Sequence, residues 1–273
     1  MTRPAPRPRR RLLQVTGVGV AALLTLSACS SDSDPAPSAK SSPSSSGQVS
    51  GTVTVFAAAS LKETFTALGE QFEKAHPGTK VTFNFAGSDS LAASITGGAP
   101  ADVFAAASAK TMAIVTAEKD NATAPVTFVR NQLEIATLPG NPDKVTGLKD
   151  LTKSGLKVVL CDKTVPCGAA ADKILTATGV KVTPVSYEQD VKSALTKVEL
   201  KEADAALVYR TDVHAAGTKV QGVDFPESSQ AVNDYPIALL KNAPNAAAAA
   251  EFIALVRSAE GQKILTEAGF LQP

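Results

Sequence analysis

The 273-residue sequence contains no tryptophan, and aromatic residues make up only 5% of it. This scarcity disfavours sites built on broad stacking platforms, which proteins that hold sugars or nucleic-acid strands often need. Histidine occurs only at His76 and His214, and cysteine occurs three times. No histidine or further cysteine stands near Cys161 and Cys167 to complete a zinc site. We therefore expect no metal site and no cofactor.

The net charge of +1 conceals an uneven distribution of charge along the chain. Residues 1–28 hold five arginines and no acidic residue, which leaves 22 of the 27 basic side chains against all 26 acidic ones. The remainder thus has a net charge of −4, which gives no electrostatic reason to bind nucleic acid or an anionic membrane surface. We exclude both as functions.

Residues 1–28 have the pattern of a lipoprotein signal peptide, with a basic start and then an apolar run. The run ends in Leu26-Ser27-Ala28-Cys29, which resembles the bacterial lipobox, where the cysteine sulfur receives a lipid and becomes the mature N-terminus. An ordinary cleaved signal with a chance cysteine is the alternative. Arg9-Arg10 leaves the general and the twin-arginine export routes both open.

Residues 29–51 are rich in serine, proline and alanine and hold almost no large apolar residue. Such a segment cannot bury enough surface to offset its ordering entropy, so we expect a flexible tether. Cys29 would anchor this tether to the outer face of the bacterial cytoplasmic membrane, which would be the only contact of the protein with a membrane.

Beyond the tether, short apolar runs alternate with amphipathic segments. The runs predict strands at 52–56, 80–86, 102–104, 157–161, 182–186, 205–209 and 237–240. The amphipathic segments predict helices at 61–75, 91–95, 169–176, 191–200 and 245–257. This alternation is typical of α/β folds with largely parallel sheets, in which ligands bind at the carboxyl ends of strands.

Cys161 and Cys167 form a C-x5-C pair in one short segment. In an exported protein such a pair predicts a disulfide. Closing so small a loop stabilises the fold by about 2–3 kcal/mol in the chain-entropy model. Its main expected effect is to hold one loop in one shape.

Three strand-to-helix junctions carry small or hydroxyl residues without charge at the tip. The first ends in Ser60, which is expected to form a capping box with Glu63. The second contains Ser88 and Ser90, and the third is the turn 165–168. Neutral donors at helix N-termini suit a small desolvated anion. The alternative is that each serine only caps its helix.

Five motifs follow one another in the body: VTVFAAASL at 53–61, FAGSDSLA at 85–92, GAPADVF at 98–104, VPCG at 165–168 and ALVY at 206–209. In this order they resemble the periplasmic molybdate-binding proteins of ABC importers, and the resemblance extends from about Val53 to the Ala268-Gly269-Phe270 ending.

The resemblance implies the two-lobed periplasmic-binding-protein fold of type II, with an α/β architecture. Each lobe would be a mostly parallel sheet flanked by helices, with the ligand cleft between the lobes. Residues 52–130 plus 233–273 are expected to form lobe I, and residues 131–232 lobe II. Crossovers near 129–132 and 230–235 would join the lobes and allow hinge closure.

In that family, two serine hydroxyls, backbone N–H groups and one tyrosine hydroxyl hold a tetrahedral oxyanion. Position by position, these donors fall on Ser60, Ser88, the N–H groups of Cys167 and Val191, and Tyr209. Gly87 and Asp89 depart from residues that are commonly serine. Asp89 brings a carboxylate near a dianion, and we expect it to point away as a cap.

The implied function is capture of molybdate and its delivery to an ABC permease, by a monomer without enzymatic activity. Tungstate and sulfate are alternative ligands, because sequence does not fix the pocket size. A secreted serine hydrolase is a remote alternative, since Ser88 does not lie in a G-x-S-x-G motif and neither His76 nor His214 has an obvious acid partner. An adhesive lipoprotein would bind no ligand.

Overall fold

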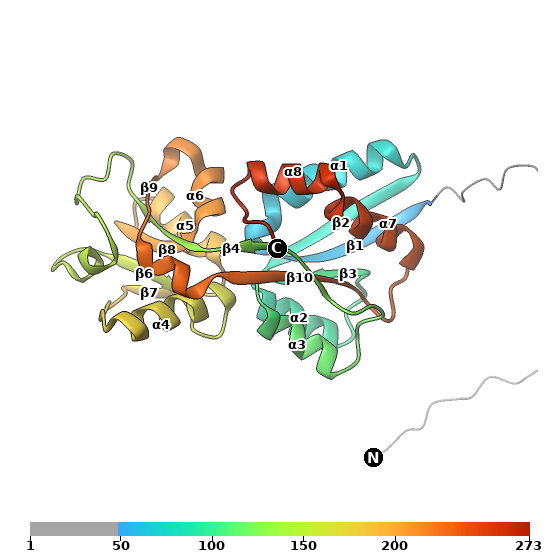
Figure 1. The fold of residues 1–273 in the computed structure, drawn as a ribbon, viewed down its shortest axis with the longest axis horizontal. Helices are drawn as coiled ribbons and strands as arrows, with labels where there is room; N and C mark the ends of the chain where they lie inside the picture. Colours follow the sequence, from blue (N-terminus) through green and yellow to red (C-terminus); the bar gives the residue numbers. More distant parts are fainter. Residues whose placement is uncertain (1–48) are drawn as a thin grey trace, which may run out of the picture. The chain divides into compact units, whose positions relative to one another are not determined.

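The computed structural model describes residues 49–273, shown as a ribbon in Figure 1. The predicted signal peptide, the lipidation site Cys29 and residues 29–48 of the expected tether lie outside the described residues. Residues 49–273 contain two five-stranded sheets, with strand orders β2-β1-β3-β10-β4 and β7-β6-β8-β5-β9. We call the first sheet with its helices the first lobe, and the second sheet with its helices the second lobe.

The first lobe is a sheet covered by helices on both faces. Its strands are β1 (Gly51–Ala58), β2 (Thr79–Ala86), β3 (Val103–Ala105), β4 (Val126–Asn131) and β10 (Asn233–Leu239). Its helices are α1 (Lys62–Ala75), α2 (Ser88–Thr96), α3 (Ala109–Ala117), α7 (Ala246–Arg257) and α8 (Ala259–Glu267). Helices α1, α7 and α8 lie over one face, and α2 and α3 over the other (Figure 1).

Aromatic side chains fill the core under α1 and α7. The ring of Phe252 meets Phe65 and Phe72 edge-on, at centroid distances of 5.9 and 5.7 Å. Phe104 and Met112 belong to a separate buried cluster on the α2/α3 face. Because both faces are buried, most of β1 is apolar without the alternation of a half-exposed strand.

The second lobe repeats this plan with a smaller set of helices. Its strands are β5 (Leu133–Thr137), β6 (Val158–Cys161), β7 (Ser186–Glu188), β8 (Ala205–Tyr209) and β9 (Gln221–Val223). Its helices are α4 (Pro166–Thr178), α5 (Val191–Glu199) and α6 (Arg210–Ala216). Four 3-10 turns complete the described chain: η1 (Ala59–Leu61), η2 (Leu148–Thr152), η3 (Gly217–Lys219) and η4 (Pro226–Ala231).

The chain passes between the sheets twice. It leaves the first sheet at the end of β4 and enters the second sheet with β5, with Gln132 between the two strands. It returns from η4 into β10. Strand β10 pairs antiparallel with β3 and β4, and β5 pairs antiparallel with β8 and β9.

The expected two-lobed α/β fold with mostly parallel sheets is confirmed: in each sheet four strands run in one direction, and only β10 or β5 runs against them. Parallel pairing is restricted to β2-β1-β3 and β7-β6-β8, so each sheet is mixed. The crossing strands arrive from the other lobe instead of through a helical crossover within their own sheet. They therefore enter in the opposite direction, which the strand-helix alternation does not reveal.

Several predicted elements have different bounds in the structure: the helix expected at 91–95 is α2, which begins at Ser88, and the strand expected at 237–240 is β10, which begins at Asn233. The strand expected at 182–186 is β7, which begins only at Ser186 and pairs with β6 alone. The helix expected at 169–176 begins at Pro166, because proline lacks an N–H group and its fixed φ suits the first helical position. This earlier start brings Cys167 into the first turn of α4.

Candidate functional site

A small cavity lies between the two lobes, where strands end and helices begin. Its volume is about 20 Å³, on a scale on which one water molecule needs about 10–15 Å³. The cavity therefore excludes a sugar or a peptide and suits only a compact ligand. All five residues that the sequence predicts as donors line it: Ser60, Ser88, Cys167, Val191 and Tyr209.

Each predicted donor stands at the carboxyl end of a strand or in the first turn of a helix. Ser60 lies in η1 after β1, and Tyr209 ends β8. Ser88, Cys167 and Val191 are the first, second and first residues of α2, α4 and α5. The first N–H groups of a helix lack an intrahelical partner and carry a partial positive potential. Three helix N-termini thus meet at one cavity.

Ser60 does not form the predicted capping box, so that expectation is wrong. The N-cap of α1 is Leu61, and no side chain bonds there. The Ser60 hydroxyl instead lies 2.9 Å from the Tyr235 hydroxyl on β10. The 3-10 turn η1 moves Ser60 one turn ahead of α1, which aims its side chain at the cavity and at β10.

Ser88 and Tyr209 both accept hydrogen bonds, Ser88 from Ala107, which also lines the cavity, and Tyr209 from Asn233, which does not. The Ala107 N–H donates to Ser88 Oγ over 2.9 Å, and Asn233 Nδ2 donates to Tyr209 Oη over 2.7 Å. Burial raises the pKa of Tyr209 well above its ordinary value, and the neighbouring Tyr235 raises it further. Tyr209 therefore keeps its proton at neutral pH.

Cys161 and Cys167 form a disulfide in the structure, with Cα atoms 5.8 Å apart. It ties the end of β6 to the first turn of α4. Gly168 follows at a close backbone approach, because a Cβ atom there would lie 1.8 Å from the Asp162 carbonyl oxygen. The disulfide and this glycine together hold the Cys167 N–H at the edge of the cavity.

Two acidic residues, Asp190 and Asp89, belong to the helix N-termini at the cavity, and their carboxylates have different surroundings. Asp190 is a lining residue, but its oxygens accept from the Ser193 N–H at 2.9 Å and from the Ser193 hydroxyl at 2.8 Å. It is thus the N-cap of α5. Asp89 does not line the cavity. The expected capping role is wrong, because the N-terminus of α2 has no side-chain cap and Asp89 Oδ1 has no hydrogen-bond partner.

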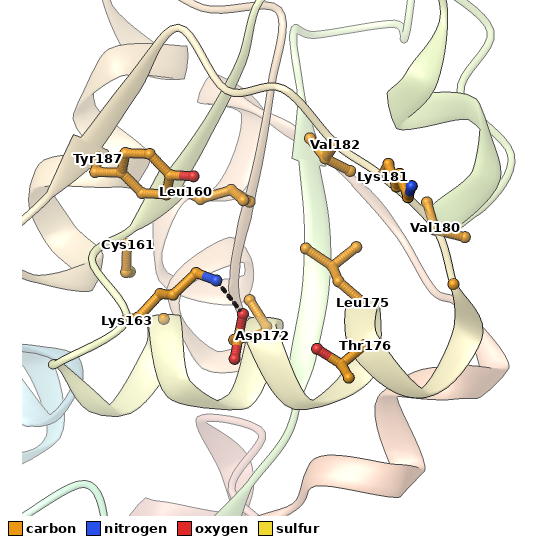
Figure 2. Close-up of a pocket in the computed structure, with 13 residues that line it drawn as sticks. Leu160, Cys161, Lys163, Asp172, Leu175, Thr176, Val180, Lys181, Val182 and Tyr187 are labelled. Atoms are coloured by element: carbon orange, nitrogen blue, oxygen red, sulfur yellow. Dashed lines mark ion pairs between the residues drawn. The ribbon is translucent and has the colours of Figure 1, made fainter.

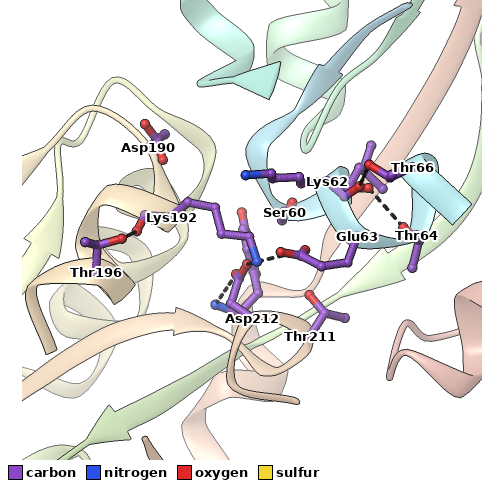
Figure 3. A network of polar contacts seen from close by, with 12 residues as sticks. Ser60, Lys62, Glu63, Thr64, Thr66, Asp190, Lys192, Thr196, Thr211 and Asp212 are labelled. Atoms are coloured by element: carbon purple, nitrogen blue, oxygen red, sulfur yellow. Dashed lines mark hydrogen bonds and ion pairs between the residues drawn. The ribbon is translucent and has the colours of Figure 1, made fainter. Parts of the chain in front are cut away.

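An ion-pair cluster of Lys192, Glu63 and Asp212 lies beside the cavity (Figure 3). Lys192 Nζ on α5 is 2.8 Å from Glu63 Oε2 on α1 of the other lobe and 3.1 Å from Asp212 Oδ1 on α6. The Asp212 side chain is fully buried. Burial raises the pKa of Asp212 to about 6, against the opposing effect of Lys192. This cluster joins the lobes electrostatically.

Sequence reasoning missed Lys192 and the asparagine and tyrosine that support the hydroxyls. Asn233 and Tyr235 lie in the predicted crossover, but nothing assigned them a role. The sequence feature that could have identified them is the polar Asn-Asp-Tyr start of an otherwise apolar strand. Polar residues at the start of a buried strand need partners. Asn233 and Tyr235 find them in hydroxyl and carbonyl groups around the cavity, and Asp234 pairs with Arg130.

A larger pocket, of about 370 Å³, lies in the second lobe and holds none of the predicted donors (Figure 2). It runs along α4 beneath the segment 179–182, with Tyr187 at one end and the Lys163–Asp172 ion pair at its edge. Neither His76 nor His214 lines the cavity between the lobes.

The part of the chain that the structure describes offers neither a metal cluster nor a membrane-spanning helix. Residues 49–273 contain no group of three or more histidine, cysteine or acidic side chains placed to hold a metal ion. In the same range, no helix combines the length and the apolar character that crossing a bilayer requires.

The fold and cavity define a two-lobed binding protein, and a family model agrees. The model for bacterial extracellular solute-binding proteins matches residues 53–271, so the chain belongs to this family. The chain is 45% identical over 231 residues to the molybdate-binding protein ModA of Mycobacterium tuberculosis H37Rv, covering 85% of this chain and 88% of the relative.

Two more distant proteins match nearly the same share of the chain. ModA of Escherichia coli K12, also named molybdate-binding protein, is 33% identical over 232 residues, covering 81% of this chain and 89% of that protein. The structure of the Azotobacter vinelandii periplasmic molybdate-binding protein superposes with a TM-score of 0.71 at 21% identity, over 81% of this chain and 99% of that one. That structure supports the fold alone.

Proposed function

We propose that the protein captures molybdate outside the cytoplasm and delivers it to an ABC permease, without catalysing a reaction. The observation that carries the proposal is the cavity itself, where hydroxyl and N–H donors meet from both lobes and the one lining carboxylate, Asp190, is occupied as a cap. The names of relatives at 45% and 33% identity support molybdate as the ligand.

A site of neutral donors fits the chemistry of molybdate. At neutral pH molybdate is a dianion with four acceptor oxygens and no proton. Each hydrogen bond to a charged group contributes about 1.5–3 kcal/mol. Five such donors, less the costs of desolvation and closure, are enough for submicromolar affinity.

We propose that capture requires the lobes to move. Residues 52–130 plus 233–273 form one body and residues 131–232 the other, and the two connecting segments act as the hinge. Opening separates Ser60 and Ser88 from Cys167, Val191 and Tyr209, which admits the ion. Closure completes its shell of donors, and the closed monomer docks on the permease.

A competition titration tests the ligand. Full-length protein in detergent is titrated with molybdate by calorimetry, alone and in the presence of tungstate or sulfate. Submicromolar molybdate binding supports the proposal. Tighter binding of tungstate or sulfate would identify that ion as the ligand instead. Absence of binding for all three ions would refute the proposed function.

The attachment to the membrane is a separate part of the proposal. Residues 1–28 act as the signal peptide, Cys29 carries the lipid and residues 29–51 form the tether. Mass spectrometry of the protein extracted from the membrane fraction is expected to find Cys29 as the mature N-terminus with a lipid on its sulfur. An unmodified Cys29 would contradict the anchor.

A further inference from the structure

Tyr235 is a fully buried tyrosine of β10 that contacts two of the predicted donors without lining the cavity. Its hydroxyl oxygen lies 2.9 Å from Ser60 Oγ, and it is hydrogen-bonded to the Tyr209 hydroxyl as well. A buried hydroxyl costs free energy unless it has such partners. Because Tyr235 does not line the cavity, any effect that it has on a ligand passes through one of these donors.

The position of the Tyr235 side chain is fixed by further contacts. Asn131, the last residue of β4, donates from Nδ2 to Thr211 Oγ1 over 2.8 Å and to Tyr235 Oη over 3.4 Å. Its Oδ1 accepts from the Gln132 N–H over 3.0 Å, so the nitrogen end of the amide faces the two hydroxyls. The tyrosine ring meets Phe270 edge-on at a centroid distance of 5.5 Å. The ring and the hydroxyl of Tyr235 are thus both held by the surrounding structure.

The two donors depend on Tyr235 to different degrees. Within residues 49–273, Ser60 Oγ has a hydrogen bond with Tyr235 alone, and a serine hydroxyl can occupy three staggered positions about a single bond. Tyr209 Oη also accepts from Asn233 Nδ2 over 2.7 Å, and its ring meets the Tyr235 ring at 5.9 Å. Loss of the Tyr235 hydroxyl would therefore free the Ser60 side chain to rotate but leave Tyr209 held.

We propose that Tyr235 is a positioning residue that holds the Ser60 hydroxyl at the cavity through the contact between their side-chain oxygens. This role rests on the proposed function, in which Ser60 donates to the ligand. Either hydroxyl can donate in the contact, and either arrangement keeps the serine oxygen in the same place. The tyrosine contributes to binding without touching the ion, because a serine that is already fixed loses less rotational freedom when the ion binds.

A double-mutant cycle distinguishes this role from general support of the fold. Tyr235→Phe removes only the hydroxyl and keeps the ring against Phe270 and Tyr209. Molybdate affinity is measured by calorimetry for Tyr235→Phe in the wild type, in Ser60→Ala and in Tyr209→Phe. Tyr187→Phe is the matched control, because Tyr187 is an exposed tyrosine of β7 that does not line the cavity between the lobes.

Freeing a fixed rotamer and removing a polarising neighbour should weaken molybdate binding by about 5-fold in Tyr235→Phe. A similar loss is expected in the Tyr209→Phe background, because Ser60 is still present there. In Ser60→Ala, the added Tyr235→Phe change should alter the affinity by less than about 1.5-fold, since no hydroxyl remains to be held. Tyr187→Phe should bind as the wild type does. Melting curves of the empty proteins establish that each variant folds.

Three results of this cycle would overturn the inference: unchanged affinity in Tyr235→Phe, an equal loss in the wild-type and Ser60→Ala backgrounds, or a loss that disappears only in Tyr209→Phe. A tyrosine that merely supports the fold gives the second result. A tyrosine that acts through Tyr209 gives the third.

The wild-type complex provides a second measurement, which does not depend on the folding of Tyr235→Phe. In a crystal structure with molybdate, Ser60 Oγ should lie within hydrogen-bond distance of both the ion and Tyr235 Oη. A serine that has left Tyr235, or that does not contact the ion, would contradict the role. Failure of the proposed function is distinguishable, because the wild type would then bind no molybdate. If it binds tungstate or sulfate instead, the same cycle is measured with that ion.

Discussion

The cavity and the ion-pair cluster beside it are adjacent in sequence, at Val191 and Lys192, but opposite in chemistry. The cavity gathers hydroxyl and N–H groups, and its one carboxylate is occupied as the α5 cap. The cluster has a lysine held between Glu63 and the buried Asp212. A dianion needs compensation for its lost hydration, yet the lysine is kept out of the cavity.

This separation follows from the cost of burying charge. A lysine inside an empty cavity would lose hydration without gaining a partner, whereas neutral donors cost much less to leave briefly unpaired. Outside the cavity, Lys192 has two carboxylate partners, Asp212 on its own lobe and Glu63 on the other. The charges therefore join the two lobes, and in the proposed function the neutral groups contact the ligand. Four substitutions test this difference between the cavity and the ion-pair cluster.

The largest effect is expected on stability, from Lys192→Met. This change leaves the buried Asp212 without its counter-charge and should lower the free energy of unfolding by about 3 kcal/mol at pH 8. The folded-state pKa of Asp212, raised to about 6 in the wild type, rises further in the variant, so its ionisation opposes folding above that pH. The deficit should shrink as the pH falls through 6 towards 4, where Asp212 is protonated in the folded form of both proteins.

Denaturant unfolding of both proteins between pH 4 and 8 measures this deficit. Glu63→Gln is the control, because it breaks only the half-exposed arm of the cluster and should cost less than about 1 kcal/mol. Molybdate affinity of Lys192→Met should fall less than 5-fold. A loss of 100-fold or more would mean that the lysine charge itself holds the ion, and the contrast between the two regions would be wrong.

The second effect is expected on affinity, from Ser60→Ala. Loss of one hydrogen bond to a charged ligand costs about 1.5–3 kcal/mol, or roughly 10- to 100-fold in the dissociation constant. Calorimetric titration with molybdate measures it. Thr66→Ala, an exposed hydroxyl on α1 that bonds the Lys62 carbonyl, is the control and should bind as the wild type does. Equal affinity of Ser60→Ala and wild type would remove Ser60 from the proposed site.

The sequence predicts the local part of this architecture well. Strand β8 has the predicted bounds, and β1, β2, α1 and α5 differ from them by one to three residues, because apolar spacing reflects which face each element buries. The five predicted donors reach one cavity for a related reason. Each belongs to a strand-to-helix junction, and in α/β folds these junctions gather at one edge of a sheet.

Long-range partners could not be predicted in this way. Ser60 and Tyr235 are 175 residues apart, and a local Ser-x-x-Glu pattern indicates the wrong partner for this serine. The same pattern assigns Glu63 to the capping box, but Glu63 pairs with Lys192 on the other lobe. These contacts depend on how the lobes meet. The direction of β10 depends on it as well, because its antiparallel pairing follows from where the chain returns and not from its composition.

The third effect, about 10-fold on affinity, is expected from Gly87→Ala. A Cβ atom at Gly87 would lie 2.6 Å from the Gln189 carbonyl oxygen of the other lobe, so the lobes could not approach fully. The φ of Gly87 is −57°, which alanine adopts freely, so the empty protein should melt within about 1–2 °C of the wild type. Gly147→Ala is the matched control, because a Cβ atom added at Gly147 would meet no atom within 4 Å. Unchanged affinity in Gly87→Ala would show that closure does not need this approach.

The smallest effect is expected from Glu134→Gln, which tests an acid with a raised pKa outside the lysine cluster. Burial raises the pKa of Glu134 to about 7, with a further contribution from Asp224 and opposition from Arg210. The unfolded-state value is lower, about 4.3, so the ionised carboxylate opposes folding above pH 7 and the opposition is absent below about pH 4. Glutamine should therefore stabilise the protein at pH 8.

Because Glu134 is only half-buried, solvent limits this gain to less than about 1 kcal/mol, or roughly 2–4 °C in the melting temperature. Melting curves at pH 8 and pH 4 should show the gain at the first pH and none at the second. Molybdate affinity should not change, since Glu134 does not line the cavity. A change in molybdate affinity would mean that the charge of Glu134 affects ligand binding from outside the cavity. The affinity would then depend on the surrounding charges as well as on the neutral donors.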